Sequence, residues 1–243
     1  MRHPFFASPR PLVFAHRGGS ALAPENTIAA FDNGRRLGAD GLELDVHLSR
    51  DGSVMVHHDR TLDRTTALRG PIAERTASEL ARANVPSLAE VLARYRDVRI
   101  IVELKVNRVE LAAAAVDVVR RADAVDRVCF GSFARRVLRA VRSIEPSVAT
   151  SAAREEVRLA LYRSWIRWPV SRVAYDGYQI PEWAGTTRVV SPWFVACAHR
   201  AGLGVQVWTV DTEADATRLL GWGVDALITN RPDIIVPICT RQS

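Results

Sequence analysis

Short apolar runs alternate with helical patterns along most of the chain, and this alternation limits the possible folds more than any other feature. A strand that runs parallel to the one before it needs a crossover, which is usually a helix. Roughly eight such repeats follow one another without a Gly-, Ser- or Pro-rich linker, which favours a TIM barrel. The expected strands are 12–15, 41–47, 53–57, 99–104, 127–130, 147–150, 173–179, 205–209 and 226–229. We therefore predict an α/β fold in which a single domain, a (β/α)₈ barrel, spans residues 1–243.

One departure from the regular alternation follows the second barrel strand. Residues 48–86 contain an extra apolar run and several turns before the next helical pattern begins near Ser87. A structureless loop of about forty residues is uncommon inside a compact domain. We therefore expect a small insertion that folds over the mouth of the barrel.

Carboxylates occur at regular spacing on two of the expected strands. Glu43 and Asp45 alternate with apolar residues, so both project from the same face of their strand. In a later strand, Glu103 shares a face with Lys105. Buried carboxylates repel each other unless positive charge lies between them, and oxygen ligands suit a hard divalent cation. We predict a cation site, and the alternative is a set of buried ion pairs with Arg17 and Lys105.

Two segments bring histidines to the ends of expected strands. His16 and Arg17 follow the first strand and precede two glycines, whose missing side chains would let the backbone approach a ligand. His57 ends the extra strand and His58 follows it, and alternation places only one of them toward a site and does not say which. Histidine suits both removal and donation of a proton near neutral pH.

Composition narrows the class of partner and the compartment. The net charge of +6 favours anionic partners, but the arginines are dispersed and form no basic block, so we expect a small molecule and no nucleic acid. Cys129, Cys197 and Cys239 are widely spaced, which predicts reduced thiols. No secretory leader is recognisable and no apolar run is long enough to span a bilayer. We therefore expect a cytoplasmic protein.

One helical segment raises the question of membrane contact. Val157, Leu161, Trp165 and Trp168 recur at helical spacing and form one apolar stripe. A tryptophan stripe flanked by arginines can lie on an anionic membrane surface. A barrel also needs apolar helix faces to cover its strands, so we expect the stripe to pack inward and expect no membrane contact.

Nine short motifs, each weak alone, follow one another in a specific order and spacing. They are His16-Arg17-Gly18-Gly19, Pro24-Glu25-Asn26-Thr27, Glu43-Leu44-Asp45-Val46, Asp51-Gly52, His58-Asp59, Asp63-Arg64-Thr65-Thr66, Glu103-Leu104-Lys105, Val207-Trp208-Thr209-Val210 and Thr229-Asn230-Arg231-Pro232. Together they resemble the signature of the glycerophosphodiester phosphodiesterase family, from about Leu12 to Asp233. Agreement over nearly the whole chain makes the resemblance specific.

The resemblance implies a TIM barrel with an insertion after the second strand, and hydrolysis of glycerophosphodiesters to sn-glycerol 3-phosphate and an alcohol. It also implies one divalent cation, Mg²⁺ or Ca²⁺. By position in the motifs, the resemblance implies that the acid–base pair is His16 and His58. It implies that the cation ligands are Glu43, Asp45 and Glu103, and that the substrate-binding groups are Arg17, Lys105 and Trp208. Of the two adjacent histidines, the resemblance therefore selects His58 and not His57.

Two positions differ from the commonest pattern of the family. Asp211 stands where Asn often follows the Trp-Thr-Val motif, and Asn230 stands where Asp often precedes Arg-Pro. Neither residue is an expected ligand, so the differences bear on substrate preference and not on the reaction.

Three other functions are compatible with parts of the pattern. They are a lipid phosphodiesterase of the sphingomyelinase-D or lysophospholipase-D type, a phosphodiester-binding protein without catalysis, and an enzyme that forms a Schiff base through Lys105. The sequence leaves open the alcohol of the substrate, the native cation, the roles of the two histidines and the oligomeric state. It also leaves open whether water or a glycerol hydroxyl attacks the phosphate.

Overall fold

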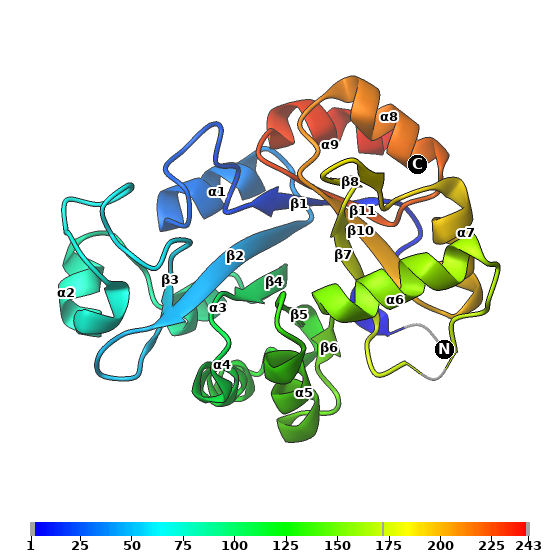
Figure 1. Cartoon of the computed structure of the whole chain (residues 1–243). Helices are drawn as coiled ribbons and strands as arrows, with labels where there is room; N and C mark the ends of the chain where they lie inside the picture. The colour runs from blue at the N-terminus through cyan, green and yellow to red at the C-terminus, as the bar shows by residue number, and fades with distance from the viewer. Residues whose placement is uncertain (1–2, 172, 242–243) are drawn as a thin grey trace.

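Eight parallel strands form the centre of the computed structural model, which describes residues 3–171 and 173–241 (Figure 1). Around the barrel the strands lie in the order β6, β5, β4, β2, β1, β11, β10, β7. A parallel bridge between Ser151 and Gly177 joins β6 to β7 and closes the ring. The bounds are β1 Leu12–His16, β2 Gly41–Leu48, β4 Arg99–Leu104, β5 Val128–Gly131, β6 Ala149–Thr150, β7 Gly177–Pro181, β10 Gly204–Trp208 and β11 Ala226–Thr229. The expected TIM barrel is confirmed.

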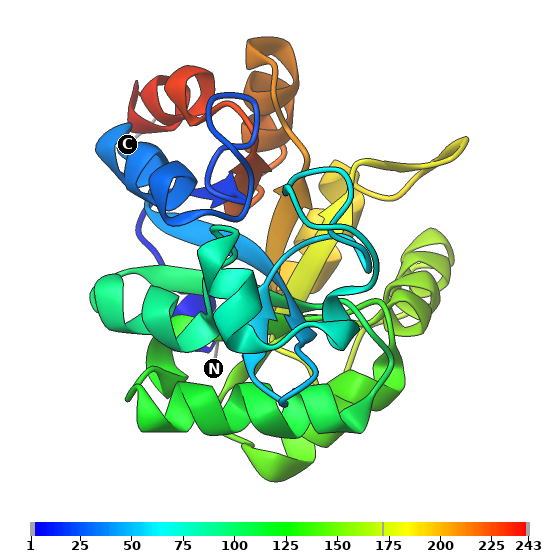
Figure 2. The same ribbon diagram turned by 90° about the vertical axis from the view of Figure 1, so that its left-hand side faces the viewer.

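Helices between the strands cover the outside of the barrel (Figures 1 and 2). Their bounds are α1 Ile28–Arg36, α3 Leu88–Arg94, α4 Val109–Arg121, α5 Arg135–Ile144, α6 Arg154–Trp165, α7 Pro192–Arg200, α8 Glu213–Gly221 and α9 Pro232–Arg241. Several begin at a hydroxyl that caps the first turn. Thr27, Ser87 and Thr212 each accept a hydrogen bond from the backbone N–H three residues later, which satisfies one of the donors that a helix start leaves unpaired.

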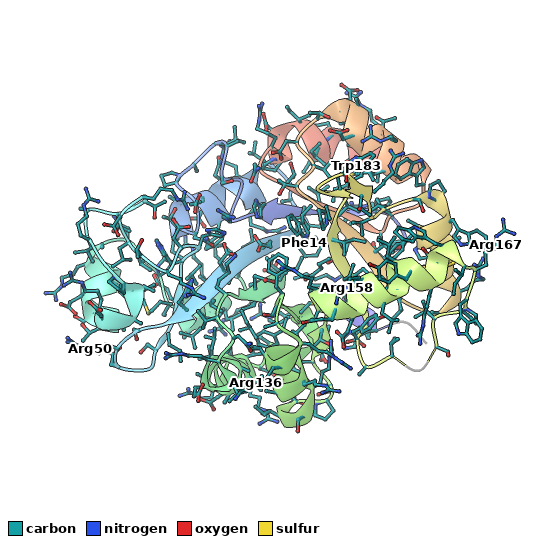
Figure 3. The ribbon with its side chains drawn as sticks, viewed as in Figure 1. Phe14, Arg50, Arg136, Arg158, Arg167 and Trp183 are labelled. Carbon is teal, nitrogen blue, oxygen red and sulfur yellow. The ribbon has the colours of Figure 1, made fainter. Side chains whose placement is uncertain are left out.

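Aromatic rings close the end of the barrel opposite the carboxyl ends of the strands. Phe5 and Phe6, in the short 3₁₀ helix η1 (Pro4–Phe6), are buried there, and Phe5 stacks on Phe14 of β1, which is labelled in Figure 3. A Cβ at Gly177 or Gly204 would lie 2.5 Å from the Phe6 ring. Glycine at these two positions therefore lets the ring enter, and the filled end leaves the opposite end of the barrel for a ligand.

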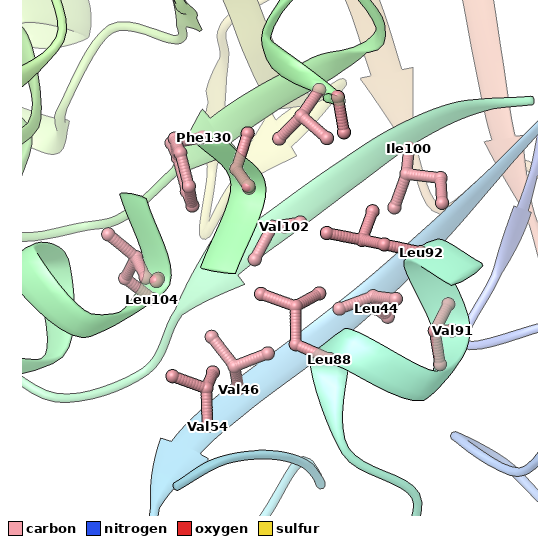
Figure 4. Close-up of a cluster of buried hydrophobic side chains, with 14 of the residues drawn as sticks. Leu44, Val46, Val54, Leu88, Val91, Leu92, Ile100, Val102, Leu104 and Phe130 are labelled. Atoms are coloured by element: carbon pink, nitrogen blue, oxygen red, sulfur yellow. The ribbon is translucent and has the colours of Figure 1, made fainter. Parts of the chain in front are cut away.

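Strand β2 has an apolar outer face and a charged inner face. Leu44 and Val46 pack outward against Leu88 and Leu92 of α3, within a cluster of buried side chains (Figure 4). Since side chains alternate along a strand, the residues between them point into the barrel. The helix packing therefore fixes the direction of the β2 carboxylates.

The segment after β2 forms the expected small insertion. It contains β3 (Val54–Val56), which pairs antiparallel with β2, the 3₁₀ helix η2 (Ile72–Glu74) and α2 (Ala77–Arg82). Five buried side chains give it a core of its own: Met55, Leu62, Ile72, Leu80 and Val85. In Figure 1 the insertion extends from the β2 end of the barrel at the left.

The structure corrects the sequence analysis in three places. Strand β7 begins at Gly177 and not at residue 173, and a short hairpin, β8 (Trp183–Ala184) with β9 (Thr187–Arg188), was not expected. The apolar stripe packs inward only at its beginning, because Leu161 is 7% exposed whereas Trp165 and Trp168 are each 59% exposed.

Within the described part of the chain, no helix has the length and apolar character needed to cross a membrane.

Candidate active site

The carboxyl ends of the barrel strands open into a cavity of about 650 Å³. All eight residues that the sequence predicts for the site line it: His16, Arg17, Glu43, Asp45, His58, Glu103, Lys105 and Trp208. They come from β1, β2, β4, β10 and the insertion, so only the closed barrel brings them together. Their roles stay predictions, but their meeting in one cavity is a fact of the fold.

Strand register places the acids beside their partners. His16 of β1 lies opposite Glu43 of β2, and Asp45 lies opposite Glu103 of β4. Gly131 lies beside Glu103 on β5, and a Cβ at this glycine would clash with Glu103 Oε2. The glycine therefore leaves room for the carboxylate inside the barrel.

A tight turn after β1 brings Arg17 into the site. Arg17 has a left-handed backbone, with φ 51°, and its N–H donates to Glu43 Oε2 over 3.1 Å. The glycine that follows also has positive φ, and its Cα faces α1, because a Cβ there would clash with Ala30. Gly18 therefore allows the turn to pack against a helix, while the approach of this backbone to a ligand stays a prediction.

Asp45 is the best neutralised of the three acids. Arg17 Nε lies 3.3 Å from one of its oxygens and Lys105 Nζ lies 3.2 Å from the other. Asn26 Nδ2 also donates to Asp45 Oδ2 over 2.9 Å. Burial alone would raise the pKa of Asp45, but Lys105 and Arg17 outweigh it, so its pKa is lowered. Asp45 therefore stays ionised and holds the side chains of Arg17 and Lys105 in place.

Glu43 and Glu103 are buried acids with little compensation. Burial, together with the charge of Asp45, raises the pKa of Glu43 to about 7. Burial also raises the pKa of Glu103 to about 8, against the opposing effect of Lys105. Among the described residues, neither acid has a side-chain nitrogen of Arg or Lys within 4.0 Å. A positive charge added near Glu43 and Glu103 would stabilise the ionised form of both carboxylates.

The three acids fit a hard divalent cation in their chemistry. All their donor atoms are carboxylate oxygens, which Mg²⁺ and Ca²⁺ prefer, and two of the three acids are short of positive charge. No group of three or more His, Cys, Asp or Glu side chains in residues 3–171 and 173–241 is arranged around a common point as in a completed metal site. A shared cation would therefore draw these carboxylates closer together.

His16 is held by an amide that a carboxylate orients in turn. Asn230 donates from Nδ2 to Asp211 Oδ2 and from its backbone N–H to Asp211 Oδ1, both over 2.7 Å. This leaves Asn230 Oδ1 to accept from His16 Nδ1, at 2.6 Å. The proton then sits on Nδ1, and Nε2 faces the cavity side, 3.7 Å from Glu43.

His58 is held by charges of the insertion. Its Nδ1 lies 2.6 Å from Asp59 Oδ1, and Arg64 joins Asp59 to Glu25 with contacts of 2.6 Å on both sides. Glu25 in turn contacts Arg17 over 3.2 Å. Burial lowers the pKa of His58. One chain of alternating charges therefore runs from His58 back to the first barrel strand.

His57, the neighbour of His58, points elsewhere. It is buried, its Nε2 donates to the Thr61 carbonyl over 3.1 Å, and it does not line the cavity. The structure thus places His58 and not His57 beside the other predicted site residues.

The other half of the cavity is mostly apolar and aromatic. Phe133 follows β5 and meets Trp208 edge to face, with ring centres 6.2 Å apart. Ile180 and Val189 also line it and are buried, whereas Trp183, labelled in Figure 3, is 50% exposed. The cavity therefore has a strongly charged side that suits a phosphate and a mostly apolar side, which suits carbon and is also lined by Arg154.

Several residues of the site have no role in the sequence analysis. Asn230 and Asp211 appear there as separate differences from a family pattern, and Glu25, Asp59 and Arg64 appear only as letters of motifs. The signal was present, because polar residues within a motif that also holds a catalytic candidate often position it. The sequence does not show which of these residues contact one another, because contacts between distant segments depend on the closed barrel.

The comparisons with known proteins agree with this site. The model of the "Glycerophosphoryl diester phosphodiesterase family" matches residues 16–234. A glycerophosphodiester phosphodiesterase of Caldanaerobacter subterraneus is 30% identical over 96% of this chain and 99% of its own, and a probable glycerophosphodiester phosphodiesterase 2 of Mycobacterium tuberculosis is 32% identical over 92% and 89%.

Solved structures give the same result. A glycerophosphodiester phosphodiesterase from Agrobacterium tumefaciens has a TM-score of 0.76 and 28% identity, over 93% of this chain and 99% of its own. A phosphodiesterase from Oleispira antarctica, in complex with the product sn-glycerol-3-phosphate, has a TM-score of 0.74 and 26% identity, over 94% and 96%. The fold and its relatives thus define the class, a TIM-barrel phosphodiesterase.

The match extends over almost the full length of these relatives, and the motifs it contains meet in the cavity. The chain belongs to the glycerophosphoryl diester phosphodiesterase family, as the resemblance predicted.

Proposed function

We propose that the protein hydrolyses glycerophosphodiesters to sn-glycerol 3-phosphate and an alcohol, with His16 and His58 as the acid–base pair. The observation that carries this proposal is that both rings line one cavity while a side-chain oxygen holds each Nδ1. Nε2 of each ring is then left to exchange a proton with the substrate. The relative from Oleispira antarctica, which holds that product, supports the choice of substrate.

The reaction forms one phosphorus–oxygen bond and breaks another. One histidine takes the proton of the attacking oxygen, and the other donates a proton to the departing alkoxide. If the attacking oxygen comes from water, this step gives glycerol 3-phosphate directly; if it comes from a glycerol hydroxyl, a second step follows in which water opens the cyclic phosphate. The lowered pKa of His58 favours its neutral form and therefore the role of base. Arg17 and Lys105, both held by Asp45, stabilise the negative charge that grows on the phosphate oxygens. Trp208 lies against the carbon atoms of the glycerol.

We also propose that Glu43, Asp45 and Glu103 hold one divalent cation, Mg²⁺ or Ca²⁺. When bound, such a cation neutralises charge on the non-ester oxygens of the phosphate. The raised pKa values of Glu43 and Glu103 support this proposal, because a nearby cation favours the ionised carboxylate.

Two further points belong to this proposal. Residues 1–243 act as one domain, in which the insertion at about 48–86 supplies His58, and the substrate is a small molecule and not a nucleic acid. We place the protein in the cytoplasm, since Cys129 and Cys197 are buried free thiols, which suits a reducing compartment.

Release of glycerol 3-phosphate from glycerophosphoglycerol tests the reaction. His16→Ala and His58→Ala are each expected to lower kcat by about 10² to 10⁴, while the matched control His57→Ala changes it little. EDTA is expected to abolish turnover, and Mg²⁺ or Ca²⁺ to restore it. Full activity in EDTA would contradict the cation, and a damaging His57→Ala beside a harmless His58→Ala would contradict the acid–base pair. Lysophosphatidylcholine, as a second substrate, tests the lipid phosphodiesterase alternative.

A further inference from the structure

Besides Arg17 and Lys105, one more basic side chain, that of Arg154, lines the cavity, and it has no part in the reaction described above. Arg154 begins α6 directly after β6, and its side chain lines the cavity. Its guanidinium lies over the Phe133 ring, 4.9 Å from the ring centre, and Phe133 in turn meets Trp208. In the barrel order β6 is four strands from β1, so Arg154 follows the strand across the barrel from that of His16.

The charge of Arg154 is not compensated as those of the other two cations are. Arg17 and Lys105 both pair with Asp45, whereas in residues 3–171 and 173–241 no carboxylate lies within 4.0 Å of Arg154. Glu156, two residues further along α6, is held by two other arginines. The acids that line the cavity all belong to β2 and β4. Arg154 is exposed, so this side of the cavity presents to the solvent a positive charge that no carboxylate of the described residues pairs with.

We propose that Arg154, positioned by Phe133, is a subsite for an anionic group on the leaving alcohol, and that a second phosphate is the ligand it fits. The proposal rests on the proposed hydrolysis, in which the reacting phosphate lies beside Arg17 and Lys105. A guanidinium binds phosphate through two parallel hydrogen bonds, and stacking on a ring limits the freedom it must lose. The Phe133 ring alone would accept a choline group, but Arg154 brings a like charge to the same place.

Three diesters that differ in the charge of the leaving alcohol test the subsite. Bis(glycerophospho)glycerol has an anionic leaving group, glycerophosphoglycerol a neutral one and glycerophosphocholine a cationic one. Arg154→Glu is expected to lower kcat/KM about tenfold for the first, to change the second less than threefold and to raise the third. The matched control is Arg158→Glu, since Arg158 is an exposed arginine one turn further along α6 that does not line the cavity (Figure 3). Arg154→Lys keeps the charge and is expected to retain most of the preference.

A binding measurement separates this inference from the proposed reaction. Calorimetry with bis(glycerophospho)glycerol compares His16→Ala with the double variant His16→Ala, Arg154→Glu, and Kd is expected to rise about tenfold. Equal effects of Arg154→Glu on all three diesters, the same change of preference from Arg158→Glu, or an unchanged Kd would each overturn the subsite. Absence of turnover with every diester would overturn the hydrolysis, and the Kd comparison would still decide the role of Arg154.

Discussion

The contact between Asp211 and Asn230 changes how two unusual residues are understood. The resemblance leads one to expect an amide at the first position and a carboxylate at the second, and this chain has them exchanged. The two side chains hydrogen-bond to each other over 2.7 Å, so the exchange keeps one amide and one carboxylate in the same pair. As a result, His16 is held by a neutral oxygen with the charge one residue further away. The sequence shows both differences, but only the fold shows that they compensate.

Substitution of this pair therefore has an expected order of effects. Asn230→Ala removes the acceptor of His16 Nδ1, and we expect kcat to fall about 10- to 100-fold, with KM changed less, because the ring loses its fixed tautomer. The exchange variant Asp211→Asn, Asn230→Asp keeps a partner for each group and is expected to retain more activity than Asn230→Ala. Steady-state kinetics measure both, with Ser20→Ala as the control, since Ser20 Oγ also donates to Asn230 Oδ1. Wild-type kcat in Asn230→Ala would show that His16 needs no orienting partner.

At the level of elements, local patterns were predictable and contacts between elements were not. The alternation along β2 predicts that Glu43 and Asp45 share a face, because the strand period is local. Which residue of β4 lies beside Asp45 depends on register between two strands that are far apart in sequence, so the alternation suggests Glu103 as a ligand but does not show that it lies next to Asp45. The stripe expected to continue to residue 168 failed at Trp165, the last residue of α6, and at Trp168, which lies beyond the end of the helix. Periodicity gives the apolar face of a helix but not where its neighbour ends.

The insertion gives an element whose function can be separated from its stability. Arg64 is half exposed and bridges Asp59, the partner of His58, to Glu25, the partner of Arg17. Exposed ion pairs contribute only about 0 to 1 kcal/mol to stability, so Arg64→Gln is expected to leave the melting temperature nearly unchanged. It is expected to lower kcat several-fold, because Asp59 is then free to turn away from His58. The control is Arg50→Gln, which removes a longer surface contact, to Glu79, in the same insertion. A large loss of stability in Arg64→Gln would assign the bridge to folding.

For the molecule as a whole, the buried acids of the site determine how stability depends on pH. The folded chain holds protons on Glu43 up to about pH 7 and on Glu103 up to about pH 8, whereas the unfolded chain releases them near pH 4.5. The folded state thus binds more protons in this interval, so its stability falls as the pH rises. His47 and His58 have the opposite effect, since burial lowers their pKa, but it ends near pH 6.5. Between pH 6.5 and 8.0 the two acids therefore dominate.

Without divalent cations, the melting temperature is expected to fall by about 5 °C from pH 6.5 to pH 8.0, which corresponds to roughly 2 kcal/mol in a chain of this size. Glu103→Gln removes the larger of the two contributions and is expected to flatten the dependence, while Glu110→Gln, an acid of the α4 surface, keeps it. Mg²⁺ or Ca²⁺ is expected to raise the melting temperature more at pH 8.0 than at pH 6.5, because the cation competes with these protons. Calorimetry at both pH values measures all three effects. An identical slope in Glu103→Gln would show that this acid is already ionised in the folded chain without any cation.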